Sequence, residues 1–227
     1  LAIYEEGTTF YGSKDLITWK KLSNLRFGFE CPDLVELPLD GDPEKMKWVL
    51  YDAAGKYLVG HFDGTYFLDD NKSKEDLYMD VGPDFYAGQT FFPKTLPEKK
   101  YIQLAWMDEW NGGIDEKPWE RNATFPVELG LVTRDGMMRV TRTPIAGIKK
   151  LYTGSTVRTT NQNLNHENIL KEVRSKAFDM TVSFDLEGAT ADEIIFEIAS
   201  IKYRYNIADQ KLMYQGVQKN KFGSKNP

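Results

Sequence analysis

A series of short apolar runs separated by glycine turns constrains the fold of this chain most strongly. Met46–Tyr51 is an apolar, aromatic run, Ala54-Gly55 is a turn signal, and Lys56–Phe62 is a second alternating run. Asp63-Gly64 turns the chain again, and Thr65-Tyr66-Phe67 begins a third run. This pattern is typical of antiparallel strands in a meander. Propeller blades are four-stranded meanders of this kind, although a β-sandwich gives the same local pattern. The sequence therefore predicts an all-β protein.

The same pattern continues towards the middle of the chain. Tyr101–Trp106 is an apolar run that predicts a buried strand. Val127–Val132 and Met137–Val140 flank an Asp-Gly turn and predict a hairpin. Thr143-Pro144 is expected to break the pattern, and we place the end of a first domain, 1–151, at Leu151.

The second part, 152–227, has a different composition. We expect one short helix over His166–Arg174. Strands are expected at Phe178–Leu186, Ile194–Ser200, Lys202–Ile207 and Lys211–Tyr214, where apolar residues alternate with polar ones.

Composition excludes several classes of function. The net charge is −5 in 227 residues, and the basic residues are not clustered, so we expect no nucleic-acid partner. No apolar run approaches the ~20 residues of a membrane helix, so no membrane partner is expected. The single cysteine excludes an internal disulfide. Neither a Cys/His cluster nor a glycine-rich phosphate loop is present, so we predict no cofactor and no metal.

One tetrapeptide, Glu30-Cys31-Pro32-Asp33, indicates chemistry. It lies between the aromatic Phe27-Gly28-Phe29 and an apolar alternation that begins at Leu34. A carboxyl group in apolar surroundings has a raised pKa, which suits it to donating a proton to a leaving group. A structural alternative also fits these four residues, namely a glutamate at a strand end beside a proline.

Further segments give the tetrapeptide a context. They are Tyr11–Trp19, Tyr57–Gly64, Asp80–Phe91, Leu104–Met107 and Phe125–Leu129. In this order they resemble glycoside hydrolase family 32, the β-fructosidases, which include levanases, inulinases and invertases. The resemblance runs from about Tyr11 to Leu151.

The resemblance implies an incomplete five-bladed β-propeller over 1–151 and part of a β-sandwich over 152–227. It implies hydrolysis of terminal β-D-fructofuranoside bonds in fructans or sucrose, with a fructose-containing oligo- or polysaccharide as partner and a secreted or periplasmic parent. The family's nucleophile motif, Trp-x-Asn-Asp-Pro-Asn, and its Arg-Asp-Pro motif do not occur in the sequence. We therefore expect a piece of a larger enzyme that is inactive alone. No oligomeric state is predicted.

Other functions remain open at this point. The chain could be a non-catalytic carbohydrate-binding or vestigial fragment of such an enzyme. It could belong to another class of five-bladed sugar hydrolase, or its parent could transfer fructose to another sugar rather than to water.

Residue roles follow from the resemblance. Glu30 is the predicted acid/base, and Cys31 is expected to be a buried, inert thiol in the extended geometry that a following proline favours. Cys31 and Asp33 are expected at the substrate-binding site, where Asp33 either hydrogen-bonds near Glu30 and tunes its pKa or caps a turn. Asp80 and Asp84 are candidates at the rim of the sugar site, with a solvated turn as the alternative.

Aromatic residues complete the candidate site. Tyr86, with Phe85, is expected either to wall the sugar site or to fill the core. Trp106 is a candidate sugar-stacking residue, because sugars bind by their C–H faces to aromatic rings, with a core position as the alternative. Trp19 and Trp48 are expected in the core.

Overall fold

The glycine turns close antiparallel hairpins in the structure, which is a computed structural model. Gly55 turns the chain between β5 (Asp42–Tyr51) and β6 (Lys56–Phe62), and the bounds of β6 agree with the sequence prediction. Its φ of +76° favours glycine, and a Cβ here would lie 2.9 Å from Cε1 of Phe85. The turn therefore needs glycine for its conformation and for the close packing of Phe85.

The structure describes residues 2–3, 7–80, 82, 84–92, 100–107, 122–154, 156–162, 168, 170–171, 173–175, 178–198, 201–215 and 224–225. The other elements are β1 (Ala2–Ile3), β2 (Thr8–Gly12), β3 (Lys20–Leu25), β4 (Asp33–Leu39), β7 (Phe67–Asp69), β8 (Leu77–Tyr78), β9 (Phe85–Phe91), β10 (Ile102–Met107), β11 (Asn122–Ala123), β12 (Val127–Arg134), β13 (Met137–Pro144), the 3₁₀-helix η1 (Ala146–Leu151), β14 (Glu193–Ile198), β15 (Ile201–Asn206), β16 (Lys211–Gln215) and β17 (Ser224–Lys225). Apart from η1, the regular secondary structure of the described part is therefore β, as the sequence predicts.

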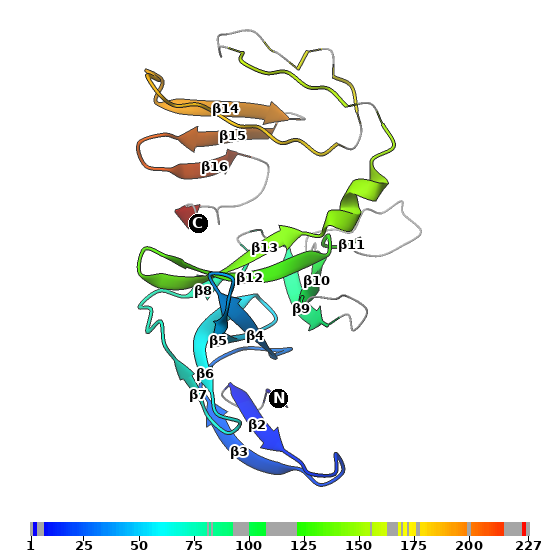
Figure 1. Cartoon of the computed structure of the whole chain (residues 1–227), viewed down its shortest axis with the longest axis vertical. Helices are drawn as coiled ribbons and strands as arrows, with labels where there is room; N and C mark the ends of the chain where they lie inside the picture. The colour runs from blue at the N-terminus through cyan, green and yellow to red at the C-terminus, as the bar shows by residue number, and fades with distance from the viewer. Residues whose placement is uncertain are drawn as a thin grey trace.

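Two antiparallel meanders form the large middle sheet (Figure 1). In one, β4, β5, β6 and β7 are successive neighbours, and in the other the order is β9, β10, β12, β13. A single parallel pair, Leu131 with Leu39, joins β12 to β4. β1, β2 and β3 form a separate sheet. Four-stranded meanders of this kind are the units from which propellers are built.

The C-terminal end of strand β5 is buried on both of its faces. Val49 and Tyr51 belong to a large apolar cluster with residues of β4, β6 and β12. Leu50 points the other way, into a smaller cluster with Phe10 and Phe27. Because successive side chains of a strand point to opposite faces, β5 lies between two packed layers. Burying each such side chain stabilises the fold by roughly 1.5–3 kcal/mol.

The two tryptophans expected in the core differ. Trp48 is half-buried against the smaller cluster. Trp19 is 54% exposed, and its indole Nε1 donates a hydrogen bond to the Leu16 carbonyl at 3.3 Å. The core prediction is wrong for Trp19, because its loop places the ring at the surface, where the indole N–H finds a local partner.

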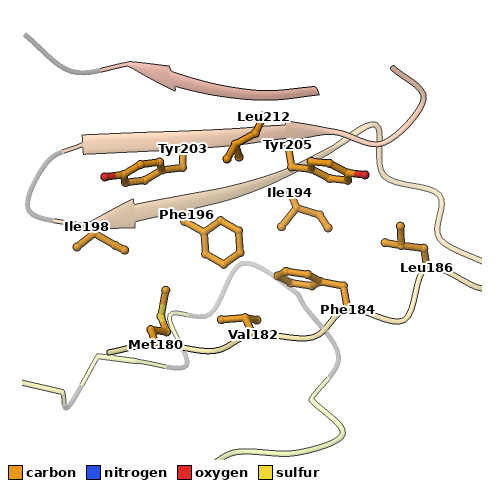
Figure 2. Close-up of a pocket in the computed structure, with 10 residues that line it drawn as sticks. All are labelled: Met180, Val182, Phe184, Leu186, Ile194, Phe196, Ile198, Tyr203, Tyr205 and Leu212. Carbon is orange, nitrogen blue, oxygen red and sulfur yellow. The ribbon is translucent and has the colours of Figure 1, made fainter. Parts of the chain in front are cut away.

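The C-terminal part contains a second antiparallel sheet, β14–β15–β16–β17, which lies beyond η1 in Figure 1. Figure 2 shows its apolar face opposite the 178–186 run, with Phe184 against Phe196. The centroids of these two rings are 5.4 Å apart. Strands β14, β15 and β16 confirm three predicted strands with shifts of one or two residues at their ends.

Three expectations about secondary structure are wrong or fall partly outside the described residues. Phe178–Leu186 forms no strand, because its alternating side chains face the sheet across a cavity and its backbone makes no ladder with a neighbouring strand. Thr143-Pro144 does not end the pattern, since β13 extends to Pro144 opposite Val127. Of the predicted helix His166–Arg174, only 168, 170–171 and 173–174 are described, and these are not helical. No helix in the described part of the chain is long and apolar enough to cross a membrane.

Candidate active site

Glu30 lies in the bend that leads into β4. Its carbonyl accepts a hydrogen bond from the Ala53 N–H at 2.7 Å, so the β5–β6 turn holds its backbone. Its side chain is exposed, and that of the preceding Phe29 is 60% exposed. The apolar enclosure expected from the aromatic neighbours is therefore wrong, because Phe27 points into the core while Phe29 does not.

Cys31 differs from both expectations for it. Its φ is +43°, in the left-handed region rather than the extended region that proline favours in its predecessor. Its thiol is exposed rather than buried. The tight bend before β4 overrides the local preference, and the chain reaches extended geometry only at Asp33, where β4 begins.

Tyr86 on β9 holds the Glu30 carboxylate. The phenol donates a short hydrogen bond to Oε2 of Glu30. The next residue, Ala87, donates its N–H to the Ala53 carbonyl at 2.8 Å. Glu30, Ala53 and Ala87 are thus linked through their backbones, which fixes β9 beside the bend that carries Glu30.

Trp106 lies next to Tyr86 in the sheet. The two residues are direct partners in the antiparallel ladder of β9 and β10, and on its other side Trp106 pairs with Ala123 of β11. Directly opposite residues project from the same face of a sheet. Trp106 is 50% exposed, so the core alternative is wrong. An exposed indole, a phenol and a carboxyl group therefore occupy adjacent positions.

Asp33 forms hydrogen bonds with residues of β5 and β9. Its carboxylate accepts from the Tyr51 hydroxyl at 2.7 Å, from the Thr90 N–H at 2.8 Å, and from the Thr90 hydroxyl. Burial, followed by the charge of Asp33, raises the pKa of Tyr51, so this phenol stays protonated and remains a donor.

Asp80 is paired with a residue that the sequence did not indicate. Arg142 on β13 donates to Oδ2 of Asp80, and the Gly82 N–H donates to Oδ1 at 2.7 Å. Arg142 also donates to Oε1 of the buried Gln103 at 3.0 Å, and its guanidinium lies 4.8 Å from the centre of the Phe85 ring.

The pairing neutralises much of the charge of Asp80. Of the neighbouring candidates, Asp84 is half-buried and Phe85 is buried in the core. Phe85 therefore takes the core alternative, whereas Tyr86 is half-buried and donates its hydrogen bond to Glu30.

Sequence reasoning missed Tyr51, Thr90 and Arg142. Tyr51 ends an apolar run that predicts only a strand, and Thr90 lies in a segment that contributes only to the family resemblance. A polar group at the end of a buried run is the signal that points to Tyr51, since buried hydroxyls need partners. Arg142 is one of two arginines on a half-exposed strand, and only tertiary structure distinguishes it. The described residues contain no group of three or more metal-ligating side chains.

Comparison with known protein families gives a match over residues 4–144 to the model described as the glycosyl hydrolases family 32 N-terminal domain. The levanase of Bacillus subtilis (strain 168) is 29% identical over 211 residues, which cover 83% of this chain and 31% of the levanase. The extracellular exo-inulinase of Meyerozyma guilliermondii is 35% identical over 142 residues, which cover 55% of this chain and 27% of the inulinase.

Among solved structures, the β-fructofuranosidase of Schwanniomyces occidentalis complexed with fructosyl-erythritol aligns with a TM-score of 0.57 and 21% identity. The alignment covers 91% of this chain and 46% of that one. At this identity the likeness concerns the fold alone. The chain spans less than half the length of each of these three proteins.

Proposed function

This chain belongs to glycosyl hydrolase family 32, and from that premise we propose that it supplies the acid/base half of a β-fructosidase active site. The reaction is hydrolysis of terminal β-D-fructofuranoside bonds in fructans or sucrose. The observation that carries the proposal is the exposed Glu30 carboxylate, hydrogen-bonded by Tyr86 beside the exposed indole of Trp106.

The proposed chemistry is that of a retaining glycosidase. Glu30 protonates the departing glycosidic oxygen while an aspartate attacks the anomeric carbon and forms a fructosyl-enzyme. Glu30 then removes a proton from the water that releases fructose, which returns the carboxyl group to its starting state. The two carboxyl groups of retaining enzymes lie ~5–5.5 Å apart.

The aspartate belongs to the family motif that this sequence does not contain. We call this chain preceded by that nucleophile segment the extended enzyme, and the activity is proposed for it. The two meanders and the N-terminal sheet of 1–151 fit blades of an incomplete five-bladed propeller, and the C-terminal sheet fits part of a β-sandwich over 152–227. The first of the relatives compared above is a levanase and the second an extracellular inulinase, which supports fructans as substrates and a secreted or periplasmic parent.

We assign a different role to each of the remaining candidate residues. Trp106 stacks on the sugar beside the scissile bond, and Asp84 stays at the rim as a candidate contact. Cys31 is adjacent to Glu30 and holds the bend rather than reacting. Asp80 acts indirectly, through the ion pair that fixes β13 against the Phe85 end of β9.

Product analysis tests the proposal. The extended enzyme is incubated with sucrose, inulin and levan, and released fructose is followed by chromatography. We expect fructose from at least one of the three substrates, and no release by the 227-residue chain alone. Failure of the extended enzyme on all three substrates would overturn the proposal, whereas hydrolysis by the chain alone would overturn the need for the external aspartate.

A further inference from the structure

Asp33 has a carboxylate whose two oxygens are both engaged by protein donors. Oδ1 accepts from the Leu34 N–H at 2.9 Å, and Oδ2 accepts from the Tyr51 hydroxyl and from both the N–H and the hydroxyl of Thr90. A carboxylate has about four lone-pair sites, two on each oxygen, so three donors fill Oδ2 and one site is left on Oδ1. Most of the carboxylate is thus engaged within the protein, which leaves Asp33 poorly suited to bind a sugar hydroxyl, the role that its proximity to Glu30 first indicates.

One donor to Asp33, Thr90, comes from a strand that the backbone ladder does not connect directly to β4, whereas Tyr51 lies on β5, the ladder neighbour of β4. Within the described residues, β9 pairs with β10, and β10 and β12 separate it from β4 in the sheet. The carboxylate joins β4 to β9 through Thr90, and the β5–β6 turn joins the same segments through Ala53. Side-chain and turn contacts thus supply a connection that sheet pairing does not.

The Asp33–Thr90 contact runs parallel to the contact that holds the acid/base. Glu30 lies three residues before Asp33, and Tyr86 lies four residues before Thr90. Two side-chain contacts, Tyr86 to Glu30 and Thr90 to Asp33, therefore add to the backbone link that Ala53 makes between the bend and β9. The Tyr86 and Ala53 contacts both hold the Glu30 end of the bend, whereas the Thr90 contact holds the end at which β4 begins, so the two ends together limit rotation of the bend relative to β9.

We propose that Asp33 is a positioning residue that fixes the bend carrying Glu30 to β5 and β9, so that the Glu30 carboxyl group points at the glycosidic oxygen. The inference rests on the proposed function of Glu30. Asp33 acts through Tyr51 and Thr90 and touches no reacting atom. Its loss therefore misdirects proton donation while the attack on the anomeric carbon remains intact.

Leaving-group dependence distinguishes this role from a structural one. In the extended enzyme, kcat/KM is measured for sucrose, whose leaving group needs a proton, and for an activated aryl β-fructofuranoside, whose leaving group does not. Asp33→Asn and Tyr51→Phe should each lower the sucrose-to-aryl ratio, by about ten- to hundredfold for a misplaced acid. A mere loss of folded enzyme lowers both rates equally and leaves the ratio unchanged.

Asp40 provides a matched control at the other end of β4. It accepts from the N–H and the hydroxyl of Thr133 at 2.7 and 2.8 Å, the same pair of donors that Thr90 presents to Asp33. Asp40→Asn should therefore lower the melting temperature without changing the ratio. If Asp33→Asn does not fold, Tyr51→Phe and Thr90→Val give the answer, because each removes one donor and leaves the carboxylate in place.

Glu30→Gln, measured alongside, separates this inference from the proposed function. If Glu30→Gln lowers the ratio but Asp33→Asn, Tyr51→Phe and Thr90→Val do not, Asp33 is not a positioning residue and the role of Glu30 stands. If Glu30→Gln leaves the ratio unchanged, the acid/base role falls and the inference falls with it. Parallel decreases in Glu30→Gln and in the Asp33 and Tyr51 variants support both.

Discussion

The Tyr86 phenol donates a hydrogen bond to Oε2 of Glu30, although 56 positions separate the two residues in the chain. Tyr86 comes from β9, and its ladder partner Trp106 comes from β10. The contact therefore defines where the candidate acid/base meets the candidate sugar-binding surface. A carboxyl group on an exposed bend gains a fixed direction from this one donor.

Removing the phenol oxygen should weaken catalysis more than stability. A hydrogen bond to a charged group contributes about 1.5–3 kcal/mol, which corresponds to roughly tenfold or more in rate. We expect Tyr86→Phe in the extended enzyme to lower kcat for sucrose by about that factor with a small change in melting temperature. Steady-state kinetics and a thermal melt check this, and an unchanged kcat would show that Tyr86 does not serve Glu30.

Trp106→Ala should affect turnover rather than folding. Half of the Trp106 surface is already exposed, so its truncation removes less buried area than the ~3–5 kcal/mol typical of a core tryptophan. We expect a raised KM for fructosides and a small shift in melting temperature. Trp48→Ala is the matched control, because Trp48 packs against the Phe10 cluster and should lower the melting temperature with normal kinetics in the folded fraction. The reverse pattern would exclude a sugar-binding role for Trp106.

Arg142→Met should destabilise the chain. The change leaves Asp80 without its ion-pair partner and leaves Oε1 of the buried Gln103 without its donor. Unpaired polar groups of this kind cost about 1–3 kcal/mol each. Urea unfolding of the chain measures the effect, with Arg134→Met as the control because Arg134 is exposed on β12. Equal midpoints for the two variants would contradict a structural role for the Asp80–Arg142 pair.

Asp15 should make the β2–β3 loop sensitive to acid. Hydrogen bonds from the Thr18 N–H, then the Ile17 N–H and the Ser13 hydroxyl, lower the pKa of Asp15 from 3.8 to about 2. A depressed folded-state pKa contributes stability that is present above the unfolded value and is lost as the pH falls through the folded value.

The test of this acid sensitivity is a comparison of melting temperatures. Asp15→Asn should melt below the unchanged chain at neutral pH, and the difference should close between pH 3.8 and about 2. A difference that is constant across that range would show that the anion does not stabilise the loop.

Local patterns predicted the strands because side-chain alternation and glycine turns are written in neighbouring residues. Lys56–Phe62 was predicted with the bounds that the structure gives it. Phe178–Leu186 alternates just as clearly, yet it forms no strand, because alternation reports how side chains face a core and not whether a backbone partner is present.

The candidate site was only partly predictable, for a related reason. Glu30, Tyr86 and Trp106 lie in motifs that resemble a family, and the structure brings these three together. The left-handed φ of Cys31 contradicts the preference of a residue before proline, and only the surrounding contacts reveal it. The partners Arg142 and Thr90 depend on registers between distant strands, which no local pattern contains.

Glu30→Gln in the extended enzyme tests the acid/base role of Glu30. Glutamine keeps the shape of the side chain and can still accept the hydrogen bond from Tyr86, but it has no transferable proton. We expect hydrolysis of sucrose, inulin and levan to fall by ~10²–10⁴-fold, while formation of the fructosyl-enzyme from an activated aryl fructoside is much less affected. Unchanged hydrolysis of the natural substrates by a folded Glu30→Gln enzyme would contradict that role.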